Sequence, residues 1–163
     1  MTDLETSLYE PLSQPSNLVY MPPEGESLVM MFLVLSVIVV SECKVRREEP
    51  LEMMKTAATS IVVVNRVTAT GFIRMNGETV SNNTLLFDCL IDPRFTIGFT
   101  RHKDSGLASV VICLLDNHPT GLRDCKVTVC FAKDDDARNF VEMFKMFQQE
   151  MRPLIDEALQ KEN

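Results

Sequence analysis

The chain has 163 residues, of which 45% are hydrophobic and 24% are charged, a size that suits one globular domain with terminal extensions. This composition excludes a wholly disordered, collagen-like or coiled-coil chain. The formal net charge is −7, and an acidic chain repels the phosphates that non-specific nucleic-acid binding requires. With no Trp and two Tyr, the chain also lacks the usual stacking platforms for single strands or proline-rich ligands.

The negative charge lies at the two ends of the chain. Residues 1–27 contain five acidic residues and no Lys or Arg, for a charge of −5, and residues 133–163 carry −3. The middle, residues 28–132, carries +1. Because local charge steers an encounter, the middle of the chain is compatible with an acidic protein partner.

The first two segments in chain order differ sharply in polarity. Residues 1–27 combine Pro with Ser, Asn and Glu, which predicts a disordered acidic arm. Residues 28–40 are the most apolar stretch, but they fall short of the roughly 20 residues of a membrane-spanning helix. We expect a buried strand or core helix here, since run length does not distinguish the two. A membrane anchor over residues 28–43 is the alternative, with basic residues following it.

The next segments predict a short helix and then strands. Helix formers follow Pro50, so residues 47–59 are expected to form a short helix or an ordered loop. The β-branched run 60–64 and the alternating run 67–75 predict two strands. Asn76-Gly77 then indicates a tight turn, because both residues tolerate positive φ.

Further strands are expected along the second half of the chain, at residues 85–91, 95–99, 107–115 and 125–131. The apolar run 107–115 predicts a strand that is buried on both faces, and Cys113 inside it is interpreted as a core thiol. Residues 116–124 are expected to form a loop because they contain Pro and Gly.

The last segment has helical periodicity. Its apolar residues follow one stripe: Ala137, Phe140, Val141, Phe144 and Phe147. The acidic residues 134–136 suit a helix start, where carboxylates meet unpaired N–H groups and the positive end of the dipole. Pro153 is expected to break or kink the helix. The predicted domain therefore covers residues 28–152, and residues 153–163 form a short helical tail.

Motifs for catalysis and metal binding are missing from the sequence. It has no phosphate-binding glycine motif, no nucleophile elbow, and no Cys or Ser with an evident His and acid partner. Its five cysteines are odd in number and lack zinc-ligand spacing, which argues for a reducing compartment rather than a disulfide scaffold. We expect a non-enzymatic domain without metal or cofactor.

Four cations in the near-neutral middle are the candidate binding residues. They lie at outward strand positions or in turns: Arg74, Arg94, Arg101 and Lys103. Arginines on a sheet face can bind carboxylates through bidentate hydrogen bonds. The alternative interpretation is a set of scattered solubilising cations.

Several antiparallel strands before one C-terminal amphipathic helix form the pattern of an α+β, pleckstrin-homology-like β-barrel or sandwich capped by that helix. Residues 84–93, 110–114 and 126–140 resemble the Ran-binding domain of nucleoporins, within a match that spans about residues 67–147. The resemblance implies binding of the GTP form of the small GTPase Ran in nucleocytoplasmic transport, hence a nuclear or cytoplasmic location. It also implies that the acidic tail of Ran meets cations on the domain.

Two other functions stay open at this point. One is a peptide-binding adaptor or scaffold of the same fold, which would bind a helix in a groove or an added strand. The other is a membrane-anchored adaptor that uses residues 28–43. The sequence does not decide the oligomeric state.

Overall fold

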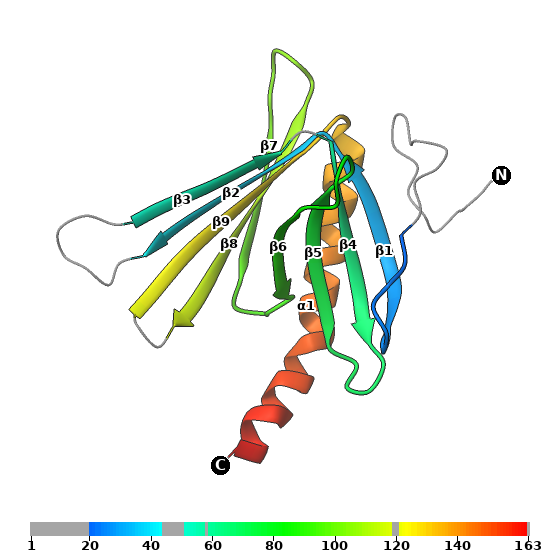
Figure 1. The fold of residues 1–163 in the computed structure, drawn as a ribbon, viewed down its shortest axis with the longest axis vertical. Helices are drawn as coiled ribbons and strands as arrows, with labels where there is room; N and C mark the ends of the chain where they lie inside the picture. Colours follow the sequence, from blue (N-terminus) through cyan, green and yellow to red (C-terminus); the bar gives the residue numbers. More distant parts are fainter. Residues whose placement is uncertain (1–19, 44–50, 58, 119–120, 163) are drawn as a thin grey trace.

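The fold is given by a computed structural model that describes residues 20–43, 51–57, 59–118 and 121–162. Within these residues, nine strands precede one helix (Figure 1). In chain order they are β1 (Glu26–Val34), β2 (Ser36–Cys43), β3 (Leu51–Ala57), β4 (Ser60–Val67), β5 (Ile73–Thr79), β6 (Leu85–Leu90), β7 (Thr96–Arg101), β8 (Ala108–His118), β9 (Gly121–Phe131) and α1 (Asp134–Glu162).

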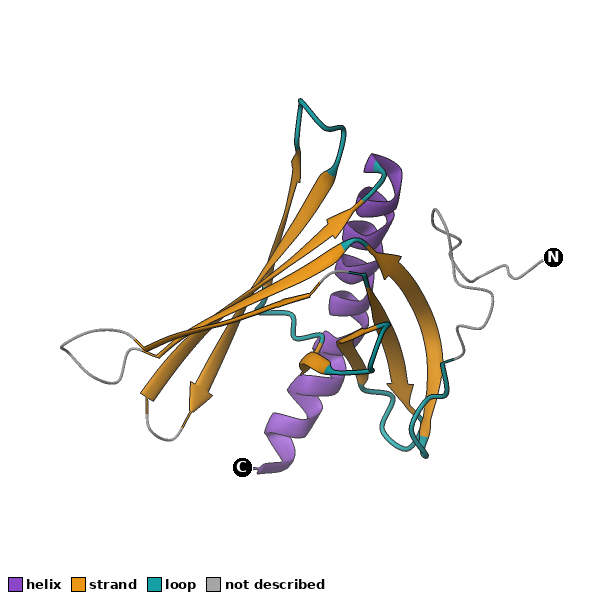
Figure 2. Cartoon of the chain, turned by 45° about the horizontal axis from the view of Figure 1, so that its top comes forward, coloured by secondary structure: helices purple, strands orange, loops and turns teal. Residues whose placement is uncertain are grey.

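The strands form two antiparallel sheets, with the orders β1-β4-β5-β6 and β3-β2-β9-β8-β7. β1 passes into β2 through the single residue Leu35, and β3 passes into β4 through residues 58–59. Two continuous segments are therefore shared by both sheets and close one corner between them. This is the arrangement of a pleckstrin-homology-like barrel, and the predicted α+β fold class with its C-terminal helix is confirmed (Figures 1 and 2).

The helix supplies the centre of the core. Its predicted apolar stripe packs against the sheets, with Phe140 and Phe144 almost fully buried. The Phe140 ring lies 5.2 Å from that of Phe32 and 5.6 Å from that of Phe131, between centroids. Edge-to-face and tilted contacts at these separations are favourable for aromatic rings. Residues from β1, β9 and α1 thus meet in one aromatic cluster.

The apolar stretch 28–40 forms parts of β1 and β2, so the prediction of a buried strand is confirmed. The side chains that an anchor would place in lipid are instead buried in the core, among them Phe32, Val34 and Val37. In the described part of the chain, the helix is not apolar enough over a sufficient length to cross a membrane.

The helix expected within residues 47–59 is wrong where the structure describes that segment, because Leu51–Ala57 is strand β3. It pairs in antiparallel register with β2, from Val37 opposite Ala57 to Cys43 opposite Leu51. Pairing with a neighbouring strand overrides local helix propensity here.

The tight turn expected at Asn76-Gly77 is also wrong, because both residues lie within β5. Gly77 pairs with Phe87 of β6, and a Cβ at Gly77 would lie 2.4 Å from Cε1 of that ring. The glycine makes room for an aromatic ring rather than for a turn. The turn between β5 and β6 comes later, at residues 80–84, where Asn83 has a φ of 55°, and Gly71, with a φ of 82°, lies in the turn before β5.

β8 alternates between buried and more exposed side chains. Ala108, Val110 and Ile112 are fully buried, whereas Val111 is half-buried and Cys113 is exposed. The predictions of burial on both faces and of a core thiol are therefore wrong, because the period of two in a strand turns alternate residues outward. Much of the loop expected at residues 116–124 is strand, since β8 reaches His118 and β9 begins at Gly121.

The two ends differ from the expected domain boundaries. Strand β1 begins at Glu26, slightly before the expected boundary at residue 28, while the arm over residues 1–19 lies outside the described residues. The sequence predicts that Pro153 breaks or kinks the helix. The helix instead runs as one element from Asp134 to Glu162, so the prediction of a break and a separate helical tail is wrong. Pro153 is exposed, and Leu154 and Ile155 beyond it pack against the core. These contacts hold the last turns in the same helix.

Candidate strand-addition site at β7

β7 is an edge strand of the five-stranded sheet and pairs with β8 on one side. The N–H of His102 donates to the carbonyl of Leu107 at 2.8 Å. Hydrogen-bonded and non-hydrogen-bonded pairs alternate along an antiparallel ladder, so Thr100 and Gly98 also bond to β8.

The backbone groups of the intervening residues Ile97, Phe99 and Arg101 consequently point away from β8. Within the described part of the chain, no strand pairs with this side of β7. We call this row of outward N–H and C=O groups the β7 edge. An edge of this kind is a template on which another extended chain can form hydrogen bonds.

Contacts with α1 fix the position of the β7 edge. The side-chain Nε2 of Gln148 donates to the carbonyls of Asp92 and Phe95, both at 2.9 Å, which ties the β6–β7 connection to the helix. Phe95 and Phe99 are half-buried and pack against the core. Since the strand is held at its start and along one face, its outward backbone groups are preorganised for pairing.

Two arginines share one carboxylate at the far end of β7. Arg101 and Arg138 both pair with Asp134 in the first turn of α1, the second through its Nε at 3.4 Å from Oδ2. Partial burial opposes ionisation of Asp134, but the hydrogen bond and charge of Arg101, with the charge of Arg138, hold the pKa of this carboxyl below its usual value. Arg101 and Arg138 together carry one more charge than Asp134 neutralises, while Asp135 and Asp136 add negative charge to the same helical turn.

Arg138 also contacts a side chain of β7, and Lys103 is a further cation in the turn after that strand. The guanidinium carbon of Arg138 lies 5.2 Å from the centroid of the Phe99 ring, within the range of a cation–π contact. Lys103, in the turn after β7, is exposed and forms no ion pair with another described residue. Its ammonium group is therefore available to a partner without first breaking an internal pair.

Arg94 lies before the start of β7, and its charge is partly compensated. Its Nη2 lies 2.7 Å from Oδ2 of Asp92, although the side chain is 71% exposed. The side-chain hydrogen bond from Arg94 is the main cause that lowers the pKa of Asp92, and partial burial opposes it. Arg94 can therefore turn toward a partner only by sharing or leaving Asp92.

The fourth predicted cation, Arg74, is not part of this group. It lies on β5 in the four-stranded sheet, where it pairs with Glu26 of β1 and, at 2.6 Å, with Oδ2 of Asp88 on β6. The hydrogen bond to Asp88 is the largest cause that raises the pKa of Arg74. The structure thus gives Arg74 the geometry of a cross-strand tie, and brings only Arg94, Arg101 and Lys103 to β7.

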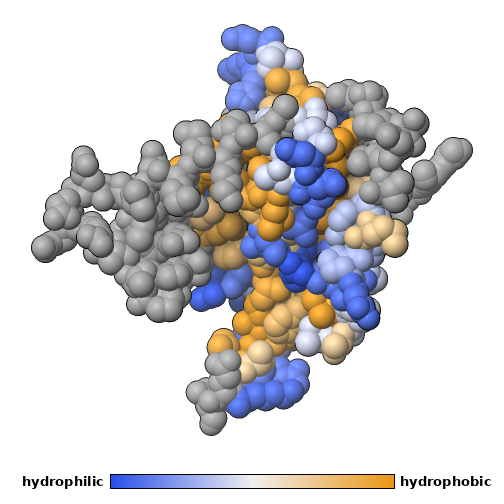
Figure 3. All heavy atoms as spheres, viewed as in Figure 1, coloured by the Kyte–Doolittle hydropathy of each residue, from blue (hydrophilic) through white to orange (hydrophobic). Residues whose placement is uncertain are grey.

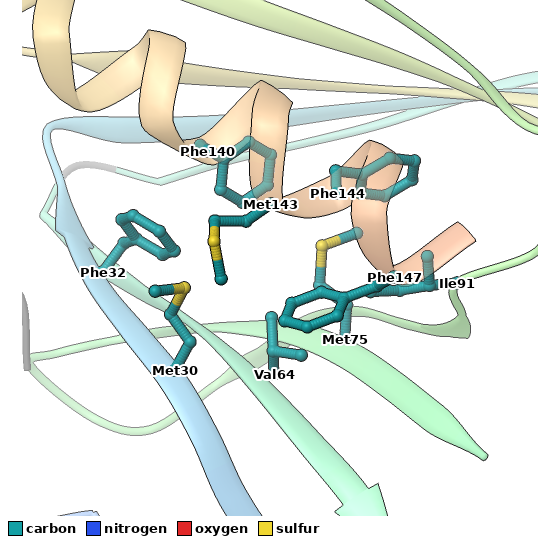
Figure 4. Close-up of a pocket in the computed structure, with 9 residues that line it drawn as sticks. All are labelled: Met30, Phe32, Val64, Met75, Ile91, Phe140, Met143, Phe144 and Phe147. Carbon is teal, nitrogen blue, oxygen red and sulfur yellow. The ribbon is translucent and has the colours of Figure 1, made fainter. Parts of the chain in front are cut away.

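The space between α1 and the four-stranded sheet is core rather than a ligand site. It contains a small cavity lined by apolar side chains from both elements, including Met30, Met75 and Phe147 (Figure 4). The cavity has room for about one water molecule and offers it no polar partner. Among the described residues, no group of three or more His, Cys, Asp or Glu could hold a metal ion.

Sequence reasoning did not single out Arg138 and Gln148. Arg138 follows Asp134 by four residues, a spacing that predicts an ion pair on a helix but not its position over Phe99. Gln148 stands next to the apolar stripe, and its role depends on carbonyls that only the folded chain brings near the helix.

No protein-family model matches the chain, and no curated protein matches its sequence. Among solved structures, the chain is similar to the crystal structure of the Ran-binding domain from the nuclear complex component Nup2 of Ashbya gossypii. The sequence identity is 13%, the TM-score is 0.45, and the match covers 78% of this chain and 99% of that one.

Proposed function

We propose that this chain is a non-enzymatic protein-interaction domain that binds an extended acidic segment of a partner as an added strand on the β7 edge. The observation that carries the proposal is the row of outward backbone groups at Ile97, Phe99 and Arg101. A partner strand that pairs there would extend the five-stranded sheet, and main-chain hydrogen bonds would supply much of its affinity.

The preference for an acidic segment follows from the charges around the edge. Arg101, Arg138 and Lys103 lie at or near the end of β7, and Arg94 lies before its start. Exposed ion pairs contribute about 0.2–1 kcal/mol each, so the cations select the partner rather than dominate its affinity. A helix bound between α1 and the sheet is disfavoured, because the core side chains described above already fill that space.

The GTP form of Ran is our candidate for the partner, with its acidic tail as the added strand. The sequence resemblance over about residues 67–147 supports this candidate, and the cations near β7 fit an acidic tail. Such a domain would act in nucleocytoplasmic transport, in the nucleus or the cytoplasm.

The decisive experiment titrates the isotope-labelled full chain with an acidic peptide of alternating Val and Glu. Strand addition predicts amide shifts at residues 97, 99 and 101, and weaker shifts on the distant strand β1. Peptides N-methylated at alternate residues provide the matched test, because a strand directs successive N–H groups to opposite sides. One methylated set should lower affinity at least tenfold, and the other should leave it nearly unchanged.

Equal effects of the two methylated sets, or shifts confined to other elements, would exclude strand addition at β7. Ran is tested separately, with its GTP and GDP forms titrated under the same conditions. Binding to the GTP form with β7 shifts supports Ran as the partner. Equal binding of both forms removes Ran as the candidate while the peptide result still decides the binding mode.

A further inference from the structure

The four-stranded sheet has an outer face that points away from α1, and this face is unexpectedly apolar. Val62 and Val64 of β4 belong to the main core, so the alternating residues Ile61, Val63 and Asn65 lie on the opposite face. A sheet covered by a helix on one face usually presents polar residues to water on the other. Figure 3 views the molecule from the side where this sheet lies in front of α1, and it shows hydrophobic residues among hydrophilic ones.

A second apolar cluster lies on this outer face. Met31, Ile61 and Val63 are 7%, 2% and 0% exposed and form a group separate from the main core. The cross-strand register supports this, with Met31 of β1 opposite Val63. Partly buried residues surround the group: Tyr20, Leu28, Leu33 and Val80. A small cluster outside the main core indicates that another segment of chain packs over the sheet.

Buried hydrogen-bond acceptors without partners accompany the cluster. Asn65 is fully buried, and its Nδ2 donates to the hydroxyl of Tyr20 at 2.6 Å, but its Oδ1 has no partner among the described residues. On the neighbouring strand, Asn76 lies opposite Val63, and in the part of the chain that the structure describes no donor reaches its buried Oδ1. Buried side-chain acceptors normally receive a hydrogen bond, so this face is suited to a segment that brings N–H or O–H groups.

The chain itself offers such a segment. Tyr20 is the first described residue, and its side chain already lies on this face against Asn65. Nineteen residues precede it in the sequence, with apolar side chains at Leu4, Leu8, Leu12 and Leu18. In extended form they would reach about 60 Å, whereas four strands span roughly 15 Å. Length therefore permits this segment to cross the whole sheet.

We infer that residues 1–19 dock on the outer face of the four-stranded sheet of their own chain. Their leucines cover Met31, Ile61 and Val63, and their backbone or amide N–H groups donate to Asn65 and Asn76. This contact lies on a different sheet from the β7 edge and does not depend on the function proposed there.

The docking is apolar rather than ionic. On the outer face, Arg74 already pairs with Glu26 and Asp88, and Glu78 adds a further acidic group that is not ion-paired to another described residue. The segment 1–19 has acidic residues and no Lys or Arg, so its charges would not be attracted to this face. Docking should consequently persist at high salt, because apolar contacts are not screened.

The test uses the full chain with Leu8, Leu12 and Leu18 replaced by Ser. We expect clear changes in the methyl NMR signals of Met31, Ile61 and Val63, and at least a threefold rise in binding of a dye that detects apolar surface. The matched control carries Asp3→Asn, Glu5→Gln and Glu10→Gln, which changes the same segment but keeps its leucines. The control should leave both readouts unchanged, and the methyl signals should be the same at low and high salt.

Two outcomes would overturn the inference. In the first, the leucine variant gives the same methyl signals and dye binding as the original chain. In the second, the leucine variant and the control both leave the methyl signals of Met31, Ile61 and Val63 unchanged. Those signals instead depend on protein concentration, and sedimentation shows a dimer. A second copy of the chain would then occupy the face.

Discussion

The two sheets use their arginines differently. In the four-stranded sheet, Arg74 pairs with Asp88 on the neighbouring strand β6 and with Glu26 on β1, so its charge stabilises the fold. At the edge of the five-stranded sheet, Arg101 and Arg138 share the carboxylate of Asp134, and Lys103 has no ion pair with any described residue. An arginine on a strand therefore indicates little about binding until its ion-pair partners are known. The outward backbone groups of β7, which pair with no other described strand, are the stronger indicator.

The largest expected difference in stability between the two sheets concerns one glycine in each, Gly77 in β5 and Gly98 in β7. Gly77→Ala places a Cβ 2.4 Å from the Phe87 ring, and we expect it to lower the free energy of unfolding by about 1–3 kcal/mol. Gly98→Ala on β7 is the control, since nothing lies within 4 Å of the added Cβ. Urea denaturation of both variants measures the difference. Equal losses would show that β7 is packed as tightly as β5.

A smaller effect is expected for the arginines themselves. Arg74→Gln leaves the mostly buried Glu26 carboxylate without its cation, and we expect a loss of about 1–2 kcal/mol in unfolding free energy. Arg101→Gln should cost less than about 1 kcal/mol, because its pair is half exposed and Arg138 still contacts Asp134. Thermal and denaturant unfolding at low salt compare the two. A larger loss at Arg101 would reverse the contrast between the sheets.

The free energy of unfolding should depend on pH through Asp136 in the first turn of α1. Burial raises the pKa of Asp136 from 3.8 to about 6, so the folded state holds this proton more tightly than the unfolded state. Between pH 4 and 6, this group therefore reduces stability as the pH rises. Asp136→Asn should remove that slope and stabilise the protein at pH 7. A shift of about two pKa units corresponds to about 3 kcal/mol, and loss of the carboxylate from the positive end of the helix dipole reduces the expected gain to about 1 kcal/mol. Stability measured from pH 4 to 7 checks this, and an unchanged slope in the variant would contradict it.

Asp134, two residues earlier, should act in the opposite direction. Its pKa is lowered in the folded state, so its contribution to stability is present above the ordinary carboxyl pKa and is lost as the pH falls through the lowered value. Asp134→Asn therefore serves as the control with the opposite sign in the same pH series.

The smallest effect is on partner binding. Lys103→Glu should weaken binding of the Val-Glu peptide by about twofold to fivefold, in keeping with one exposed charge pair. Lys161→Glu is the matched control, since Lys161 is also exposed but lies at the far end of α1. Calorimetric titration at low and high salt separates the charge effect from the backbone contribution. Equal weakening by both variants would mean that net charge, rather than position beside β7, controls affinity.

Local periodicity accounts for what the sequence predicted well. The helical stripe around Phe140 and Phe144, and the alternation of Phe95, Ile97 and Phe99, report burial directly because each element has one dominant inner face. The prediction of a core thiol at Cys113 is wrong, because an uninterrupted apolar run does not show which of its residues face outward.

Other errors came from partners that are distant in sequence. The sequence predicts a turn at Gly77, but in the structure Gly77 lies opposite Phe87 in a strand pair. It also predicts a helix or loop at residues 51–57, which instead form a strand that pairs with β2. The candidate cations show the same limit. On sequence alone, Arg74, Arg94, Arg101 and Lys103 form one candidate set. The separation of Arg74 from the other three, and the contributions of Arg138 and Gln148, depend on how the helix and strands pack.

The junction at Leu35, where β1 passes into β2, has a consequence for the order of folding during synthesis. β2 pairs along its length with β9, from Ser36 opposite Cys130 to Cys43 opposite Arg123. β2 therefore cannot form this pairing until β9, which follows it by about 80 residues, has been synthesised. Contacts of such long sequence separation slow folding and leave apolar strands exposed meanwhile. The nascent chain is therefore expected to complete its fold only after β9 and α1 have left the ribosome, and to be a client of chaperones until then.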